Sequence, residues 1–283
     1  MAVHTTGTSA KAWAPDVTTF APADAVPEAL ILQTSTVAGS VEGDAPAVRC
    51  AYVDDADAEF VAEGADIPES DPALSEVLVY TGKISQLVRL SREQFEQDGT
   101  EDRLAVSVGR AVTRRANTAY LTQAAPAVGE TTPPAGILNI TGITAGGAVT
   151  GNLDVLVDLL ATLQGNDAEP SHIITDPTGW ATLRKMKTDA TDSNESLLGA
   201  GTTDATRMLL DLPVVVSPAM TAGTGLVVDR TAVVSAVGSV LVAVSEHVYF
   251  TADSIGLRCT WRIGWNVVRP ERIGSFTITP PAP

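Results

Sequence analysis

Three histidines, His4, His172 and His247, are the residues best suited to acid–base chemistry near neutral pH. His172 lies close in sequence to Asp176, as a general base and its orienting carboxylate could. A hydrolase of the α/β type would also carry its nucleophile in a Gly-x-Ser-x-Gly turn, and that motif does not occur in the sequence. We therefore interpret His172 and Asp176 as a plain hydrogen-bonded pair, and we predict no catalytic residues.

Acidic side chains crowd together between Asp54 and Glu59, and their hard oxygens could hold a calcium ion. Their spacing does not match an EF-hand loop, however, and solvated loop tips are commonly acidic. The stretch Gly223-Thr224-Gly225 is too short for a phosphate-binding loop and lacks its lysine. The sequence therefore predicts neither a bound metal nor a cofactor.

The two cysteines, Cys50 and Cys259, stand far apart in the sequence and form neither a disulfide framework nor a zinc pattern. We interpret them as reduced, partly buried thiols. Both lie on predicted strands that we place in the same domain. The sequence leaves open whether they meet.

The 283 residues suffice for one large domain or two smaller ones, and their net charge of −16 makes the surface strongly acidic. Such a surface repels nucleic acid and anionic membranes, so we expect no sequence-specific DNA binding and no membrane contact. The sequence shows no apolar signal segment and no run of membrane-spanning length. We expect a soluble, cytosolic protein, and if it encloses DNA, it does so as a wall and not through basic contacts.

The elements that position these side chains begin with an irregular segment. Residues 1–26 lack periodicity and are interrupted by prolines, so we interpret them as a non-globular arm. Pro27 is expected to open a short helix that Gly39 ends, with Val37 facing a core.

Alternating apolar residues then predict a strand at 47–53 and a long strand at 76–90, in which Gly82 is expected to form a bulge. Between them lies a polar, turn-rich stretch that is longer than most structureless loops. Two long strands joined by a projecting acidic tip predict an extended hairpin over 47–90. Such a hairpin cannot bury itself against its own domain, so it requires a partner.

A capping box at Ser91 and Gln94 predicts a short helix, and Thr100 begins a second one that runs to about Gln123. At 1.5 Å per residue the second helix is roughly 35 Å long. Its apolar face is mostly Ala and Val, while three arginines occupy the remainder: Arg110, Arg114 and Arg115. We interpret these arginines as a solvated face or as ion-pair partners for an acidic hairpin of another subunit.

After Pro133-Pro134 the pattern changes to alternating helices and strands, which marks a domain boundary. Asp176 followed by Pro177 predicts a helix N-terminus. The last long strand, 256–268, carries Trp261 and Trp265 on one face, where we expect core or interface packing.

Five segments, in this order, resemble the tailed-bacteriophage major capsid proteins of the Hong Kong 97-like family. They are Ala58–Ser70 with Phe60-Val61 before Glu63-Gly64, Lys83–Glu93, Pro134-Ala135-Gly136-Ile137-Leu138, Leu212-Pro213-Val214, and Arg258–Pro270. Each motif alone is weak, but five in the right order are much stronger. Asp211 departs from the pattern, because glycine is usual at that position.

The resemblance implies an α+β, Hong Kong 97-like capsid fold with an N-arm, an extended β-hairpin loop, a peripheral domain with a long spine helix, and an α/β axial domain. The expected divisions are 1–26 for the arm, 27–53 and 76–134 for the peripheral domain, 54–75 for the extended loop, 135–240 for the axial domain, and 241–283 for the closing strands of the peripheral domain.

The resemblance also implies a structural protein, not an enzyme, that self-assembles into pentamers and hexamers of an icosahedral phage head enclosing double-stranded DNA. Scaffold, portal and decoration proteins are further expected partners, and assembly is expected in the host bacterial cytoplasm. The implied contacts between subunits involve Arg110, Arg114 and Arg115 of the spine helix and six residues of the hairpin: Glu59, Phe60, Val61, Glu63, Ile67 and Glu69.

Some family members cross-link the hairpin to a neighbour through a lysine. The hairpin loop of this chain has none, and Lys83 lies on the return strand, so we predict no such cross-link. Two alternatives stay open from the sequence. One is an encapsulin, a bacterial compartment shell of the same fold, although encapsulins usually begin with a helix and residues 1–26 are predicted to form an extended arm. The other is a hydrolase built on the α/β segment.

Overall fold

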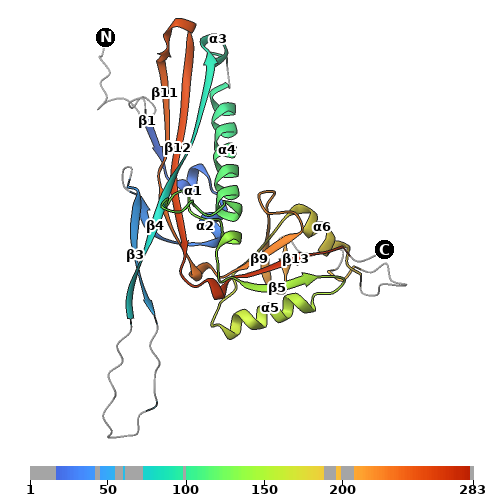
Figure 1. The fold of residues 1–283 in the computed structure, drawn as a ribbon. Coiled ribbons are helices and arrows are strands. Elements are labelled where there is room, and N and C mark those ends of the chain that lie inside the picture. Colours follow the sequence, from blue (N-terminus) through green and yellow to red (C-terminus); the bar gives the residue numbers. More distant parts are fainter. Residues whose placement is uncertain are drawn as a thin grey trace.

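Two β-sheets organise the chain in a computed structural model, which describes residues 17–41, 45–54, 60, 73–97, 100–187, 196–198 and 207–280 (Figure 1). A long sheet with one long helix beside it forms an elongated body, and a shorter sheet flanked by helices forms a second body near one end (Figure 1). A hairpin projects from the elongated body (Figure 1).

The elongated body is built on a seven-stranded sheet whose central strand is β12. Its strands are β1 (Val17–Phe20), β2 (Thr36–Val41), β3 (Ala47–Asp54), β4 (Ala73–Ser91), β10 (Val233–Gly238), β11 (Val240–Tyr249) and β12 (Ser254–Val267). β12 pairs in antiparallel register with β11, β10 and β4, while β1 extends the sheet beyond β11 and β2 extends it beyond β10. The long strands predicted from the alternating pattern are therefore confirmed.

Four helices accompany this sheet: α1 (Pro22–Ala25), α2 (Leu30–Thr34), α3 (Arg92–Phe95) and α4 (Thr100–Thr122). α4 is the long helix predicted from Thr100, and its apolar stripe of Val108, Val112 and Ala116 is buried. Trp261 and Trp265 face the same core and are buried as predicted, and the Trp265 ring meets that of Tyr120 edge-on at 5.5 Å.

β4 changes both its partner and its buried face along its length. Residues 73–80 pair with β3, whereas residues 81–91 pair with β12. In the hairpin, the face that carries Val79 is buried and the face that carries Tyr80 is exposed. Beyond the hairpin the two faces exchange roles, and Leu87, on the same face as Val79, is 61% exposed. The pairing carries no irregularity at Gly82, so the predicted bulge is wrong, because Gly82 simply stands opposite Ile263.

The second body is a six-stranded sheet with two helices, α5 (Asp154–Gly165) and α6 (Pro177–Lys185). Its strands are, in spatial order, β5 (Thr144–Val149), β13 (Gly274–Ile278), β9 (Thr224–Val228), β6 (His172–Thr175), β8 (Leu212–Val216) and β7 (Met208–Leu209). Leu156, Leu159 and Leu163 of α5 and Leu183 of α6 bury their side chains in a core of their own, distinct from that of the elongated body.

The chain leaves α4 through a tightly packed joint. Gly136 donates its backbone N–H to the Gln123 carbonyl at 2.8 Å, and the Asn139 side chain donates to the Thr122 and Gln123 carbonyls at 3.1 and 2.7 Å. Trp265 donates its indole N–H to the Ala135 carbonyl at 2.8 Å. These bonds satisfy the Thr122 and Gln123 carbonyls at the end of α4 and fix the start of the second body against it.

The strand pairing divides the chain differently from the expected boundaries. β10 was expected within 135–240 of the axial domain, but it pairs with β12 and β2 of the long sheet. β13 was expected among the closing strands of the peripheral domain, but it pairs with β5 and β9 of the second sheet. The reason is that the sequence of a short strand of this kind indicates that it is buried but does not indicate which sheet it joins.

The N-terminal segment also differs from the expectation. Residues 17–26 of the predicted arm belong to the fold, because β1 pairs with β11 and Val26 is buried in the core, while residues 1–16 lie outside the described residues. The helix expected from Pro27 is limited to α2, and Val37 lies on β2 with 45% exposure instead of facing a core.

Candidate subunit-contact surfaces

The β3–β4 hairpin presents an apolar and charged surface that its own chain leaves uncovered. Leu78 and Tyr80 remain 38% and 36% exposed on its open face. Arg49 and Glu76 form an ion pair at 2.7 Å across the two strands, and both side chains are more than half exposed. An exposed pair of this kind contributes little to stability, about 0–1 kcal/mol, so both charges stay available to another molecule.

Phe60 is the one predicted hairpin residue that the structure describes, and its side chain is fully exposed. The other five lie outside the described residues: Glu59, Val61, Glu63, Ile67 and Glu69. Phenylalanine is among the residues most often buried, so a fully exposed ring on a projecting hairpin favours a contact surface.

The three predicted arginines of α4 are all exposed, but they do not form one cluster. Arg110 and Arg114 line a groove of about 360 Å³ between α4 and the turn Ser217–Ala219 after β8. Arg115 donates instead to the Gln123 side chain at 3.2 Å. It lines a separate groove of about 290 Å³ whose other residues include Lys83, Pro133 and Trp265. The helical spacing therefore separates the arginines into two basic sites.

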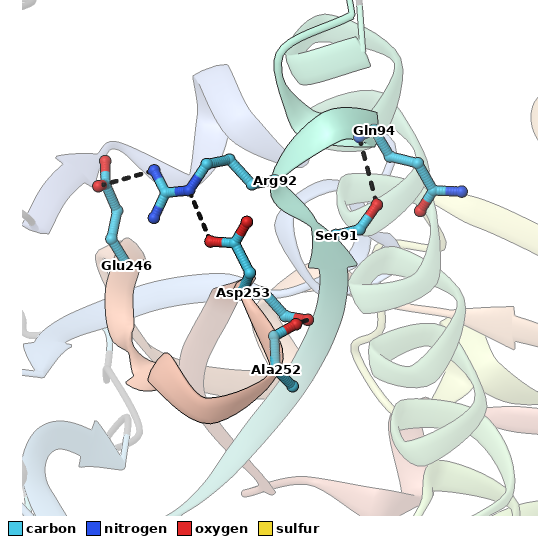
Figure 2. A network of polar contacts seen from close by, with 7 residues as sticks. Ser91, Arg92, Gln94, Glu246, Ala252 and Asp253 are labelled. Carbon is cyan, nitrogen blue, oxygen red and sulfur yellow. Dashed lines mark hydrogen bonds and ion pairs between the residues drawn. The ribbon is translucent and has the colours of Figure 1, made fainter.

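A polar network fixes the opposite end of the long sheet (Figure 2). Arg92 donates through Nε to Asp253 Oδ1 at 2.9 Å and through Nη1 to Glu246 Oε2 at 3.4 Å. Its backbone N–H donates to the Asp253 carbonyl at 3.1 Å. The Ser91 hydroxyl accepts from the Gln94 N–H at 3.3 Å, which is one of the two hydrogen bonds of the predicted capping box, while the Gln94 side chain points away from Ser91 (Figure 2). The β11–β12 end is thereby tied to the corner between β4 and α3, which sequence reasoning missed.

An apolar cavity of about 370 Å³ lies between α4 and the inner face of the sheet. Its walls come from α1, α3, α4, β11 and β12, and they include Ala25, Val26, Phe95, Leu104, Val108, Val112, Val240, Val242, Val244, Leu257 and Cys259. The alanines and valines of the helix face are small, which leaves space between helix and sheet. The helical periodicity predicted these residues as core but carried no signal of a cavity.

The predicted hydrogen bond between His172 and Asp176 is wrong, because His172 begins β6 and Asp176 follows its far end. Asp176 Oδ1 accepts from the N–H groups of Gly179 and Gly223 at 3.1 and 3.0 Å. Oδ2 accepts from the Thr178 N–H at 2.9 Å and from the Thr178 hydroxyl. Burial alone raises the pKa of Asp176, but these hydrogen bonds outweigh it and hold the pKa below its usual range. Asp176 therefore caps α6 and anchors the turn at Gly223.

His172 pairs with a neighbour instead. Its Nδ1 lies 3.1 Å from the Ser171 hydroxyl. Burial, with a smaller contribution from Arg230, lowers the pKa of His172, so the ring is neutral at pH 7. His172 and Asp176, which suggested acid–base chemistry, therefore do not interact, and each makes its own structural contacts.

Cys50 and Cys259 are free and buried in different cores. Cys50 packs with Val79 in a small cluster at the base of the hairpin, whereas Cys259 belongs to the large core beside α4. Burial raises the pKa of both thiols, which keeps them protonated at neutral pH. The question that the sequence left open is answered: the two cysteines do not meet.

Within the described residues, no group of three potential ligand side chains is placed to hold a metal ion, and most of the Asp54–Glu59 stretch lies outside them. Each helix in the same part of the chain is too short or too polar to cross a membrane.

Comparison with known proteins identifies relatives of this architecture. A sequence model described as the phage capsid family matches residues 26–277. Among curated proteins, no sequence matches the chain.

Solved structures with the same fold include those of two phages and of a GTA particle. A structure of Microbacterium phage Oxtober96 is 14% identical with a TM-score of 0.66, and the match covers 99% of this chain and 96% of that one. The capsid of an empty GTA particle is 18% identical with a TM-score of 0.66, covering 89% and 90%. The capsid of Myoviridae phage XM1 is 12% identical with a TM-score of 0.60, covering 89% and 92%.

Proposed function

The chain belongs to the phage capsid family, and from that premise we propose that it is the major shell subunit of a tailed-phage head. Copies of it would assemble into pentamers and hexamers that tile an icosahedral shell around double-stranded DNA. The observation that carries this proposal is the β3–β4 hairpin, which projects from the body with Phe60 fully exposed and is not covered by its own chain (Figure 1). A hairpin of this kind requires a neighbouring copy.

Charge supports the same arrangement. The segment from Asp54 to Glu76 contains nine acidic residues and no basic one. Arg110 and Arg114 line a groove on α4 together with Glu28, and within the described residues neither guanidinium forms an ion pair at 4.0 Å or less. We propose that acidic residues of a neighbouring hairpin, including Glu59, Glu63 and Glu69, lie opposite these arginines, with Val61 and Ile67 adding apolar contact. Head-to-tail contacts of this type close into rings.

The acidic subunit would enclose DNA without binding it specifically. A net charge of −16 repels phosphate, so confinement and not attraction holds the DNA in place. Assembly in the host cytoplasm, with portal, scaffold and decoration proteins as partners, completes the proposal.

Electron microscopy of the purified protein tests the proposed function, with nucleic-acid content measured on the same sample. Icosahedral particles, hollow or filled with phage DNA, are the expected result. Compartments that contain cargo protein and no phage DNA would instead indicate an encapsulin. Subunits that stay monomeric or dimeric even with scaffold protein supplied would contradict the shell role.

The basic groove is tested by charge reversal. The double variant Arg110→Glu/Arg114→Glu should fold normally but assemble poorly, and assembly of the unmodified protein should weaken at high salt. Arg103→Glu, an exposed site on the same helix outside the groove, is the matched control and should assemble normally. Equal assembly of the double variant and the control would rule out the groove as a contact.

A further inference from the structure

The cavity between α4 and the sheet is large enough to receive an aromatic side chain. Its volume is about 370 Å³, and an engineered apolar cavity of roughly 150 Å³ already binds benzene. Its walls are mostly Val, Leu, Ala and Phe side chains, with Cys259 at the sheet side and Asp24 as the one charged residue of the lining. A lining of this composition favours an apolar group, and Asp24 adds repulsion against a second carboxylate.

Phe60 is an aromatic side chain that its own chain leaves in water. It is fully exposed, and burying a phenyl ring removes a large apolar area from water, which is favourable in free energy. The chain therefore carries both an apolar projection and an apolar cavity, on different parts of its surface.

Phe60 cannot reach the cavity of its own chain. Asp54 stands opposite Ala73, and Cys259 stands opposite Gln86, so thirteen strand residues, or roughly 43 Å, separate the hairpin end from the cavity wall. Phe60 is six residues beyond Asp54, which gives a reach of at most about 21 Å. If a Phe60 ring fills the cavity, it must therefore come from a second copy.

We propose that Phe60 of one subunit inserts into the cavity beside Cys259 of its neighbour. This inference rests on the proposed shell function and names the apolar anchor of the hairpin contact. The projection and the cavity occupy different surfaces, so the contact is heterologous and propagates from subunit to subunit. The groove of Arg110 and Arg114 flanks the same helix, so one neighbouring hairpin can place Phe60 in the cavity and its carboxylates beside the arginines.

A disulfide trap tests the contact directly. In Phe60→Cys the new thiol should oxidise with Cys259 of the neighbour when oxidised glutathione is supplied as the oxidant, and shells should give linked oligomers on non-reducing gels. The double variant Phe60→Cys/Cys259→Ser should lose these bands. Val128→Cys is the matched control, because Val128 is equally exposed but has no place in the proposed contact.

Assembly provides a second measurement. Phe60→Ser should raise the subunit concentration needed for shells at least about tenfold, because each subunit then leaves its neighbour's cavity without a ring, whereas Phe60→Leu should still fill most of it. The inference is overturned if Phe60→Ser assembles at the wild-type concentration and Phe60→Cys gives no Cys259-dependent band. If the unmodified chain forms no shells, the proposed function fails, and the same disulfide test on concentrated soluble subunits then decides the inference by itself.

Discussion

Replacing Asp176 with asparagine should strongly destabilise the second body. The carboxylate is buried and accepts hydrogen bonds on both oxygens, from the Thr178, Gly179 and Gly223 N–H groups and from the Thr178 hydroxyl. Asparagine has one acceptor oxygen, and its amide would point N–H groups at the donors on the other side. At least one buried N–H is then without an acceptor.

The size of the effect follows from these hydrogen bonds. An unsatisfied buried donor costs about 1–3 kcal/mol, and a weakened N-cap costs about 1 kcal/mol more. We expect Asp176→Asn to lower the free energy of unfolding by about 2–4 kcal/mol at pH 7, measured by urea denaturation of dissociated subunits. Asp158→Asn, an exposed change on α5, is the control and should stay within about 0.5 kcal/mol of the wild type.

The pH dependence adds a second check with a defined sign. The pKa of Asp176 is lowered in the folded state, so its contribution is fully present above the unfolded value of about 3.9 and is lost as pH falls through the folded pKa. The difference between wild type and Asp176→Asn should therefore shrink below about pH 4. The reasoning would be refuted if the free energies of unfolding of wild type and Asp176→Asn differed by less than about 0.5 kcal/mol at pH 7, or if their difference did not change in acid.

Three further predictions concern the joint, the hairpin and the shell. Gly136→Ala would place a Cβ 2.5 Å from the Gln123 nitrogen and should cost about 1–3 kcal/mol in thermal unfolding, whereas Gly165→Ala, with open space around its Cβ, should be neutral or slightly stabilising. Deleting residues 57–70 should leave a folded subunit by circular dichroism that forms no particles in electron micrographs; normal particles would contradict this. Shells boiled in denaturant should run as single subunits on gels, because Lys83 lies outside the hairpin loop; a ladder would show cross-linking.

Local signals in the sequence were sufficient to predict several elements. Thr100 and the Ala/Val stripe predicted α4, and Asp176-Pro177 predicted the N-terminus of α6, because capping and periodicity act within a few residues. The family resemblance, which rests on the order of five motifs, is confirmed by the match to the phage capsid family over residues 26–277. Order along the chain is therefore informative even where each motif is weak.

Non-local features were out of reach of the same reasoning. β10 and β13 are short apolar strands, and which sheet each joins depends on partners far along the chain. The division of the arginines between two grooves follows from what packs beside α4, and the cavity follows from small side chains that leave a gap. Pattern and propensity describe how much a residue is buried, but not what stands opposite it.

The continuous strand β4 has a mechanical consequence for a filled container. Its hydrogen bonds to β12 run across the strand direction, and eleven residue pairs join the two strands from Thr81 to Ser91. A pull on the hairpin by a neighbouring subunit travels along β4 and loads all of these bonds in shear, so they must yield together and not one at a time. In a shell under outward pressure, this shear arrangement would resist tension better than an arrangement in which the same hydrogen bonds break one after another.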